Sequence, residues 1–164
     1  MAEFFSCPIV CNTGPINALS KANVGDLLAR LFPRVVTTDV VVAELTAKDA
    51  GDHRQIQETF AGLEIVHASE PDPLLITELD AGEASVIQAA RDLGISCVLI
   101  DERRARRIAA EAYKLEVRGT CATLVEAKRR GLLPAIKPVL ETMLGNGYFI
   151  GPNLLAEALR QAGE

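Results

Sequence analysis

The chain has 164 residues, of which 49% are hydrophobic and 24% are charged, and its net charge is −5. This length suits one domain, here taken as residues 1–164, with a core large enough to be stable without disulfides or a structural metal. The acidic balance lacks the basic signature of most nucleic-acid-binding proteins. With no Trp and 4% aromatic residues, aromatic stacking on bases is not an obvious binding device.

The sequence shows no signal peptide pattern and no apolar run of membrane-spanning length. Three of the four cysteines fall in or beside apolar segments, where free Cys is usually buried. Cys7 and Cys11 lack the usual zinc spacing and have no nearby His. We therefore expect a cytoplasmic protein with reduced thiols and no membrane contact.

The first third of the chain alternates short apolar segments with helical patterns. Residues 9–11 predict a buried strand, which stops at Asn12-Thr13-Gly14-Pro15, and a helical pattern then follows from about Pro15, with apolar positions continuing to Leu31. Residues 34–38 form a second strand candidate. The segment 39–49 opens with Asp39, a good N-cap, and predicts a short helix, although its three consecutive valines also fit a strand.

The rest of the chain continues this alternation. Residues 52–63 predict a polar, exposed helix, and residues around Pro71 and Pro73 a connector. Further strands are expected at residues 64–68, 96–100 and 115–119. Further helices are expected at residues 78–94, 102–114 and 120–131, with a C-terminal helical extension over about 134–164. Strands separated by helices predict an α/β protein with a mostly parallel sheet.

Four side chains that offer oxygen atoms stand at informative places in this pattern. Asn12 follows the first strand, and Asp101 follows the strand at 96–100. Glu44 lies on the helix after the second strand, and Glu83 lies in the first turn of the helix at 78–94. If the strands before Asn12 and Asp101 are neighbours, all four meet at the carboxyl edge of the sheet, where ligands bind in open α/β folds. Such oxygen donors suit Mg²⁺ or Mn²⁺.

Each of these residues also has a purely structural interpretation. Asn12 is a common turn former, and Asp101 could be a helix N-cap. Glu44 could be an ordinary exposed helix residue, and Asp80 with Glu83 matches a variant of the capping box. His53 is expected to be solvated, and His67 to be structural. Spacing alone therefore makes only a weak case for a metal site.

Five motifs in a fixed order strengthen that case. They are NTGPINALSKANVGDLLARLF, VVVAEL, LDAGEASVIQAA, LIDERRARRIA and VRGTCATLVEAKRRGLL. Together they resemble PIN-like domains, most closely a prokaryotic branch related to the VapC toxin nucleases, over about residues 8–155. The resemblance implies a PIN-like α/β/α sandwich with a central, mostly parallel sheet.

The resemblance also implies a Mg²⁺- or Mn²⁺-dependent ribonuclease site. The acidic positions of the family fall on Glu44, Glu83 and Asp101, and Thr120 matches a small hydroxyl position that often lines the site. Asn12 stands where the family usually has its first Asp, although members of this branch begin with either Asp-Thr or Asn-Thr. These four residues are the expected metal ligands, and the three acids are the expected catalytic groups.

Several residues are expected to contact the substrate. Arg103 and Arg104 begin the basic stretch after Asp101 and could hold RNA phosphates. Thr13 and Thr120 complete this expected set. A solvated surface is the alternative for the basic stretch as a whole.

The function that follows is an endoribonuclease acting on RNA, which could be the toxin of a toxin–antitoxin pair with an antitoxin partner and a homodimeric state. Because Asn12 removes one negative charge, the alternative is a catalytically reduced PIN-like module that binds RNA or protein. An unrelated metal-dependent phosphohydrolase fits less well, since it would need a nucleophilic Asp at Asn12. The apolar stretch at residues 134–150 could serve a dimer or antitoxin groove, or could belong to the core.

Overall fold

The computed structural model describes residues 4–48 and 53–164, so the predicted helix ends at Asp49 and Asp52 lie outside the described residues. Five strands form one all-parallel sheet in the order β3-β2-β1-β4-β5. These strands are β1 (Ile9–Cys11), β2 (Val35–Thr38), β3 (Glu64–Val66), β4 (Cys97–Leu99) and β5 (Glu116–Arg118). The predicted α/β class and parallel sheet are confirmed.

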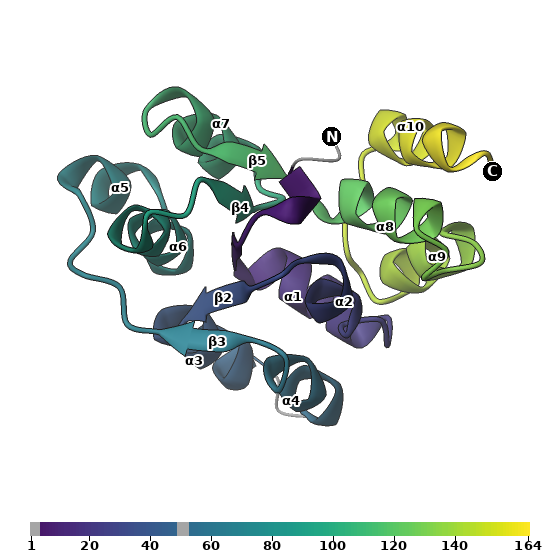
Figure 1. The fold of residues 1–164 in the computed structure, drawn as a ribbon, viewed down its shortest axis with the longest axis horizontal. Helices are drawn as coiled ribbons and strands as arrows, with labels where there is room; N and C mark the ends of the chain where they lie inside the picture. Colours follow the sequence, from purple (N-terminus) through teal and green to yellow (C-terminus); the bar gives the residue numbers. More distant parts are fainter. Residues whose placement is uncertain (1–3, 49–52) are drawn as a thin grey trace.

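Helices connect the strands and cover the sheet (Figure 1). A short 3-10 turn at Phe4–Ser6 precedes β1. The helices are α1 (Thr13–Lys21), α2 (Leu27–Leu31), α3 (Asp39–Lys48), α4 (Arg54–Phe60), α5 (Pro73–Glu78), α6 (Ala81–Leu93), α7 (Arg103–Glu111), α8 (Thr120–Arg129), α9 (Lys137–Gly145) and α10 (Pro152–Ala162). Among the described residues, no helix is long and apolar enough to cross a bilayer.

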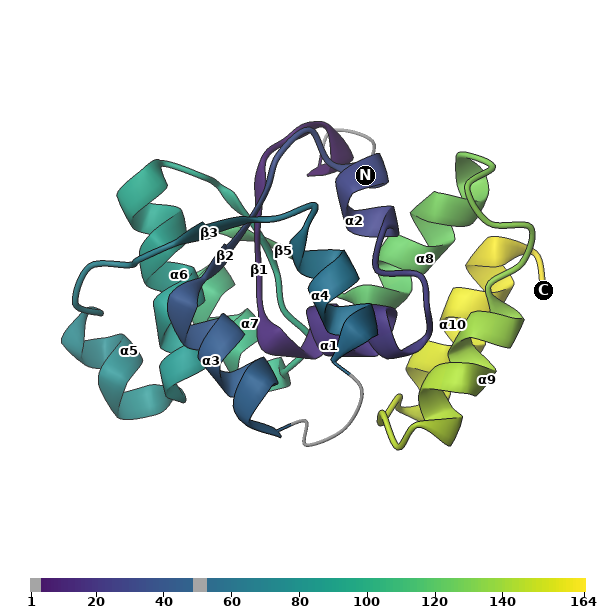
Figure 2. The same cartoon turned by 90° about the horizontal axis from the view of Figure 1, so that it is seen from below.

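The sheet order places a switch point between β1 and β4. Figure 2 shows α5 and α6 on one side of the strands, and α1, α2, α4 and α8 on the other. The chain therefore leaves β1 toward one face and approaches β4 from the other, although these two strands are hydrogen-bonded neighbours. In open α/β sheets, ligands bind in the crevice outside the carboxyl ends of such a pair. The residues directly after β1 and β4 are therefore the first place to look for a site.

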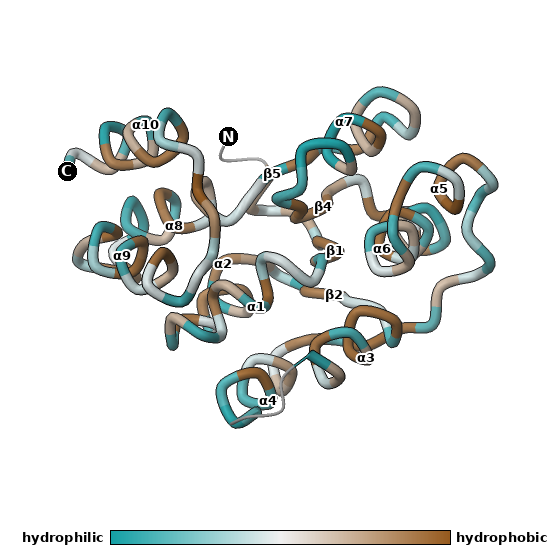
Figure 3. Tube along the Cα trace, turned by 180° about the vertical axis from the view of Figure 1, so that it is seen from behind, coloured by the Kyte–Doolittle hydropathy of each residue, from teal (hydrophilic) through white to brown (hydrophobic). Residues whose placement is uncertain are grey.

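The strands are short, and the three central ones are buried. Every residue of β1, β2 and β4 is buried, which matches the continuous apolar sequences of β1 and β4 and the two valines of β2 (Figure 3, brown). Cys11, Cys97 and Cys121 are buried, as predicted. Burial raises the pKa of Cys97 and that of Cys121 to about 11, so these thiols pack as small apolar groups.

Three local predictions need correction. The helical pattern that begins near Pro15 is two helices, because Asn23 takes a left-handed φ of 62° between α1 and α2. The predicted exposed helix α4 buries one face through Ile56 and Phe60. The predicted connector with two prolines contains α5, in which Pro73 occupies the first turn after the N-cap Asp72.

The start of α3 also differs from expectation. The described part of this segment, Asp39–Lys48, is a helix rather than a strand, but it begins at Asp39 itself. The hydroxyl of Thr38, at the end of β2, accepts a hydrogen bond from the Val41 N–H at 3.2 Å. Asp39 instead faces His67, whose Nδ1 lies 2.7 Å from the carboxylate on the surface. Thr38 therefore takes the capping position, since no loop separates the strand from the helix.

The C-terminal helices pack on the body of the molecule. Figures 1 and 2 show α8, α9 and α10 side by side at one end. Ile136, Leu140 and Met143 are buried in the same core as the sheet. Much of the apolar stretch at residues 134–150 is therefore core, although Phe149 and Leu144 are exposed.

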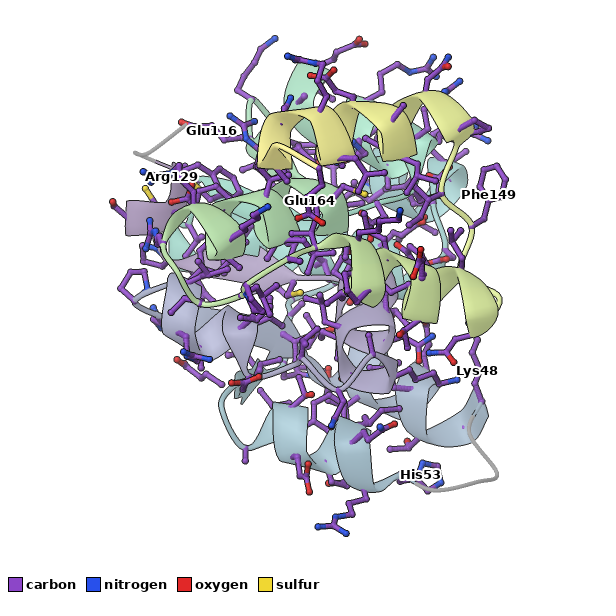
Figure 4. The ribbon with its side chains drawn as sticks, turned by 90° about the vertical axis from the view of Figure 1, so that its right-hand side faces the viewer. Lys48, His53, Glu116, Arg129, Phe149 and Glu164 are labelled. Carbon is purple, nitrogen blue, oxygen red and sulfur yellow. The ribbon has the colours of Figure 1, made fainter. Side chains whose placement is uncertain are left out.

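Glu164 connects α8 to the start of α9 (Figure 4). Its carboxylate accepts a hydrogen bond from Lys128 Nζ on α8 at 2.8 Å. It also accepts from the backbone N–H groups of Ile136 and Lys137, at the start of α9. The ion pair with Lys128, and then the two N–H groups, lower the pKa of Glu164 to about 2. A carboxylate at a helix N-terminus is the charge that the helix dipole favours.

His53 differs from the prediction as well. It was expected to be solvated within a polar helix, but it occupies the N-cap position of α4. Its Nδ1 is buried and has no hydrogen-bond partner among the described residues.

Candidate active site

A cleft of about 1310 Å³ opens at the switch point of the sheet. Its lining includes residues that follow β1 and β4, together with parts of α1, α3, α6 and α7 and the connection between α9 and α10. Asn12, Glu44, Glu83 and Asp101 all line it. Four oxygen-bearing side chains that lie far apart in the sequence therefore meet in one cleft, as the sequence pattern predicts.

Asn12 lies directly between β1 and α1. Its backbone N–H donates to the Leu99 carbonyl of β4 at 3.0 Å, which fixes the residue at the switch point. The side chain is 6% exposed and does not cap α1. Its Oδ1 is buried and accepts no hydrogen bond from any described residue. A buried acceptor without a donor is unfavourable by about 1–3 kcal/mol, so a turn-forming role alone does not account for Asn12.

Glu44 is held by groups from two other helices. Its Oε2 accepts from the Thr13 hydroxyl on α1 at 2.9 Å, and its Oε1 accepts from the Gly82 N–H on α6 at 3.1 Å. A Cβ at Gly82 would lie 2.6 Å from Glu44 Oε1, so the carboxylate can keep this position only beside a glycine. Glu44 is therefore a positioned, half-buried carboxylate and not an ordinary exposed helix residue.

Glu83 forms the capping box that the sequence suggested. The Glu83 N–H donates to Asp80 Oδ1 at 2.8 Å, and the Asp80 N–H donates to Glu83 Oε2 at 3.3 Å. The side chain also lines the cleft and is only 8% exposed. Burial, followed by the negative charge of Asp80, raises the pKa of Glu83 to about 7. The structural and functional interpretations of Glu83 are therefore compatible.

Asp101 accepts hydrogen bonds from two residues of the C-terminal half. Its Oδ1 accepts from the Thr120 N–H at 2.8 Å, and its Oδ2 accepts from the Thr120 hydroxyl at 2.6 Å and from the Tyr148 hydroxyl. It does not cap α7, because Glu102 takes that position and accepts from the Ala105 N–H at 2.8 Å. Asp101 instead joins β4 to the start of α8 and to the connection between α9 and α10.

Tyr148 is a site residue that the sequence analysis missed. Burial and the nearby charge of Asp101 raise its pKa well above the ordinary value, so the phenol stays protonated and acts as a donor. The only signal in the sequence is an aromatic residue with a hydroxyl between the glycines of GNGYFIG.

The basic residues divide into two groups. Arg103 and Arg106 line the cleft, and Arg106 Nη1 donates to the Ile100 carbonyl at 2.8 Å. Arg104 does not line it, because its guanidinium pairs with Glu78 on α5.

Thr120 is also absent from the lining of the cleft and is 1% exposed, which corrects its expected role: it supports Asp101 and is not placed to contact a substrate.

The donor set fits a hard divalent cation only with water as a major ligand. No group of three or more His, Cys, Asp or Glu side chains is arranged to hold a metal ion in residues 4–48 and 53–164. The predicted cage of Glu44, Glu83 and Asp101 is thus not preassembled. The partnerless Asn12 Oδ1 and the carboxylates around it still offer oxygen, and Mg²⁺ commonly binds through one or two carboxylates and several waters.

Comparison with known proteins gives one positive finding. No curated protein matches this chain. A family model described as a PIN domain, DUF3368, matches residues 8–164, which include every strand of the sheet and all the cleft residues described above. The parallel sheet of order 3-2-1-4-5 with flanking helices is consistent with that assignment. The chain belongs to this PIN domain family.

Proposed function

We propose that this protein is a divalent-metal-dependent endoribonuclease that hydrolyses RNA phosphodiester bonds. The observation that carries the proposal is the convergence of Asn12, Glu44, Glu83 and Asp101 in one cleft at the switch point of the sheet. Membership of a PIN domain family supports it, because PIN domains are typically nucleases that bind divalent metals.

The residues of the cleft have different roles in metal and phosphate binding under this proposal. Asn12, Glu83 and Asp101 would hold Mg²⁺ or Mn²⁺ through few direct contacts and several waters. When bound, such an ion polarises the scissile phosphate and lowers the pKa of a water that it holds. Arg103 and Arg106 line the cleft, and their guanidinium groups would bind phosphate oxygens of the RNA.

The supporting contacts keep these groups in place. Thr13 fixes Glu44, and Thr120 fixes Asp101. Glu83 or Asp101 orients the attacking water. Because these contacts come from α1, α6 and α8, the site depends on the packing of several elements and not on one loop.

A second function is favoured by one residue. Asn12 supplies a neutral oxygen where a carboxylate would add a full charge, and the charge lost is worth about 4 kcal/mol for a pair at 4 Å and an effective dielectric near 20. A PIN-like module that binds RNA or a protein with reduced or no cleavage is therefore the alternative. A toxin role, an antitoxin partner and a homodimer remain predictions.

Cleavage of an end-labelled single-stranded RNA, with Mg²⁺, Mn²⁺ or EDTA, tests the proposal. The natural chain, Asn12→Asp and Asp101→Asn are compared, with Asp26→Asn as the matched control, since Asp26 is an exposed surface residue outside the cleft. We expect metal-dependent cleavage that Asp101→Asn abolishes and Asp26→Asn leaves unchanged. Cleavage by Asn12→Asp alone would support the reduced module. No cleavage or metal binding by any variant would refute the nuclease proposal.

A further inference from the structure

One aromatic ring at the cleft has no role in the site described so far. Phe149 lines the cleft and is 84% exposed, the highest exposure among the large hydrophobic side chains of the described residues. Figure 4 shows its ring projecting from the connection between α9 and α10, at the same edge of the molecule as Lys48. Isolated surface hydrophobics are common, so exposure alone says little.

The residues on either side of Phe149 make its exposure informative. Tyr148 is anchored by the hydrogen bond from its hydroxyl to Asp101, and Ile150 is 6% exposed and packed in the core. With both neighbours fixed, the backbone at Phe149 is held in place. The ring is therefore presented to solvent by an anchored segment, which is the arrangement of a preorganised contact.

Cationic side chains line the same cleft beside its carboxylates, which are those of Glu44, Asp80, Glu83, Asp101 and Glu102. Lys21, Lys48, Arg103 and Arg106 line it, and within the described part of the chain Lys21, Lys48 and Arg103 form no ion pair. Cationic side chains that contact the phosphates, combined with an aromatic ring on which a base stacks, are the usual means of binding single-stranded nucleic acid. A base in a duplex is already stacked on both faces and cannot lie flat on such a ring without being unstacked.

We infer that Phe149 is a stacking platform for an unpaired base of the RNA that this cleft binds. This inference rests on the proposed function, because it names a residue that contacts the substrate of the same site. It also qualifies the expectation from composition. Few aromatics are needed when one stands at the mouth of the cleft beside Tyr148 and Asp101.

The test measures RNA binding in EDTA, where cleavage cannot occur. Fluorescence anisotropy of a labelled ten-nucleotide single strand and of a matched RNA duplex is recorded with the natural chain and with Phe149→Trp, Phe149→Leu and Phe149→Ala. Ile76→Ala is the control, since Ile76 is 55% exposed but lies outside the cleft on α5. Circular dichroism verifies that every variant is folded, and sedimentation reports the oligomeric state.

Stacking predicts a clear order of affinities. Phe149→Ala and Phe149→Leu should weaken single-strand binding by about 5- to 100-fold, while Phe149→Trp and Ile76→Ala bind as the natural chain does. Duplex binding should be weaker throughout and unchanged by Phe149→Ala. The Leu variant keeps an apolar side chain, so its loss separates stacking from a general hydrophobic contact.

Other outcomes overturn the inference in distinguishable ways. If the natural chain binds RNA and the Ala and Leu variants bind equally well, the stacking inference fails while the nuclease proposal stands. If truncation of Phe149 instead changes a dimer into a monomer, the ring belongs to a protein interface and the inference fails. If the natural chain binds neither RNA, the proposed function fails with it. If Phe149 proves to stack on a base but no metal-dependent cleavage is found, the inference stands and the protein is the RNA-binding module with reduced or no cleavage.

Discussion

Replacing Gly82 by Ala tests the contact that places Glu44 in the cleft. The new Cβ would lie 2.6 Å from Glu44 Oε1, whereas ordinary contact needs about 3.5 Å, so the carboxylate must withdraw by about 1 Å. The hydrogen bond from the Gly82 N–H is already 3.1 Å long and would be broken by that movement. The bond from the Thr13 hydroxyl to the same carboxylate would be strained as well.

The expected net effect on stability is small but has a definite sign. A hydrogen bond to a charged group contributes about 1.5–3 kcal/mol, and the lower end applies because Glu44 is only half-buried. Ala stabilises a helix by about 0.5–1 kcal/mol relative to Gly. Gly82→Ala should therefore lower the free energy of unfolding by about 1 kcal/mol, or the melting temperature by about 2–4 °C.

Chemical and thermal denaturation in EDTA measure this effect without any metal. Gly145→Ala is the matched control: Gly145 ends α9, and a Cβ there would meet no atom within 4 Å. The control should be unchanged or stabilised by up to about 1 kcal/mol. If Gly82→Ala matches or exceeds the control in stability, Glu44 is not held as described, and the account of this wall of the cleft is wrong.

Three further predictions follow from other contacts. Asn12→Asp should be less stable than the natural chain in EDTA, because a carboxylate is added to an acidic cleft, and Mn²⁺ should raise its melting temperature more than that of the natural chain. Thr120→Val should destabilise by about 1–2 kcal/mol in urea denaturation, since a hydroxyl that donates to Asp101 is lost from a buried position. Glu164→Gln should be less stable at neutral pH; because the pKa of Glu164 is lowered to about 2, its contribution is present above about pH 4.5 and is lost as the pH falls toward 2. Urea denaturation at several pH values should therefore show the natural chain and Glu164→Gln converging in acid, and a constant difference would contradict the role of this carboxylate.

The sequence was sufficient where structure follows from local pattern. Apolar runs located the five strands, and the alternation of strands with helices gave the parallel sheet. The stop at Gly94 gave the end of α6 to within one residue, whereas the helix begins after the N-cap Asp80, three residues later than the predicted start. Polar residues after β1 and β4 located the site, because strand ends are fixed by the same pattern.

Local pattern was insufficient where a contact joins distant residues. Glu44 accepts from residues 31 and 38 positions away, and Tyr148 donates to Asp101 across 47 positions, so no periodicity announces either contact. Caps were also misplaced by one residue. Thr38 caps α3 in place of Asp39, because α3 follows β2 without a loop. Glu102 caps α7 in place of Asp101, because α7 begins one residue later, at Arg103.

The hydrogen bond between Tyr148 and Asp101 has a consequence for motion in this molecule. Asp101 keeps that donor only while α9 and α10 stay packed, so local opening of these two helices removes one of the two hydrogen bonds to Asp101 Oδ2 and leaves the one from Thr120. A ligand that takes over this oxygen lowers the free energy of opening, and opening strengthens the binding of that ligand by the same factor. Opening of the C-terminal helices and ligand binding at the switch point of the sheet are therefore thermodynamically coupled through the hydroxyl of Tyr148.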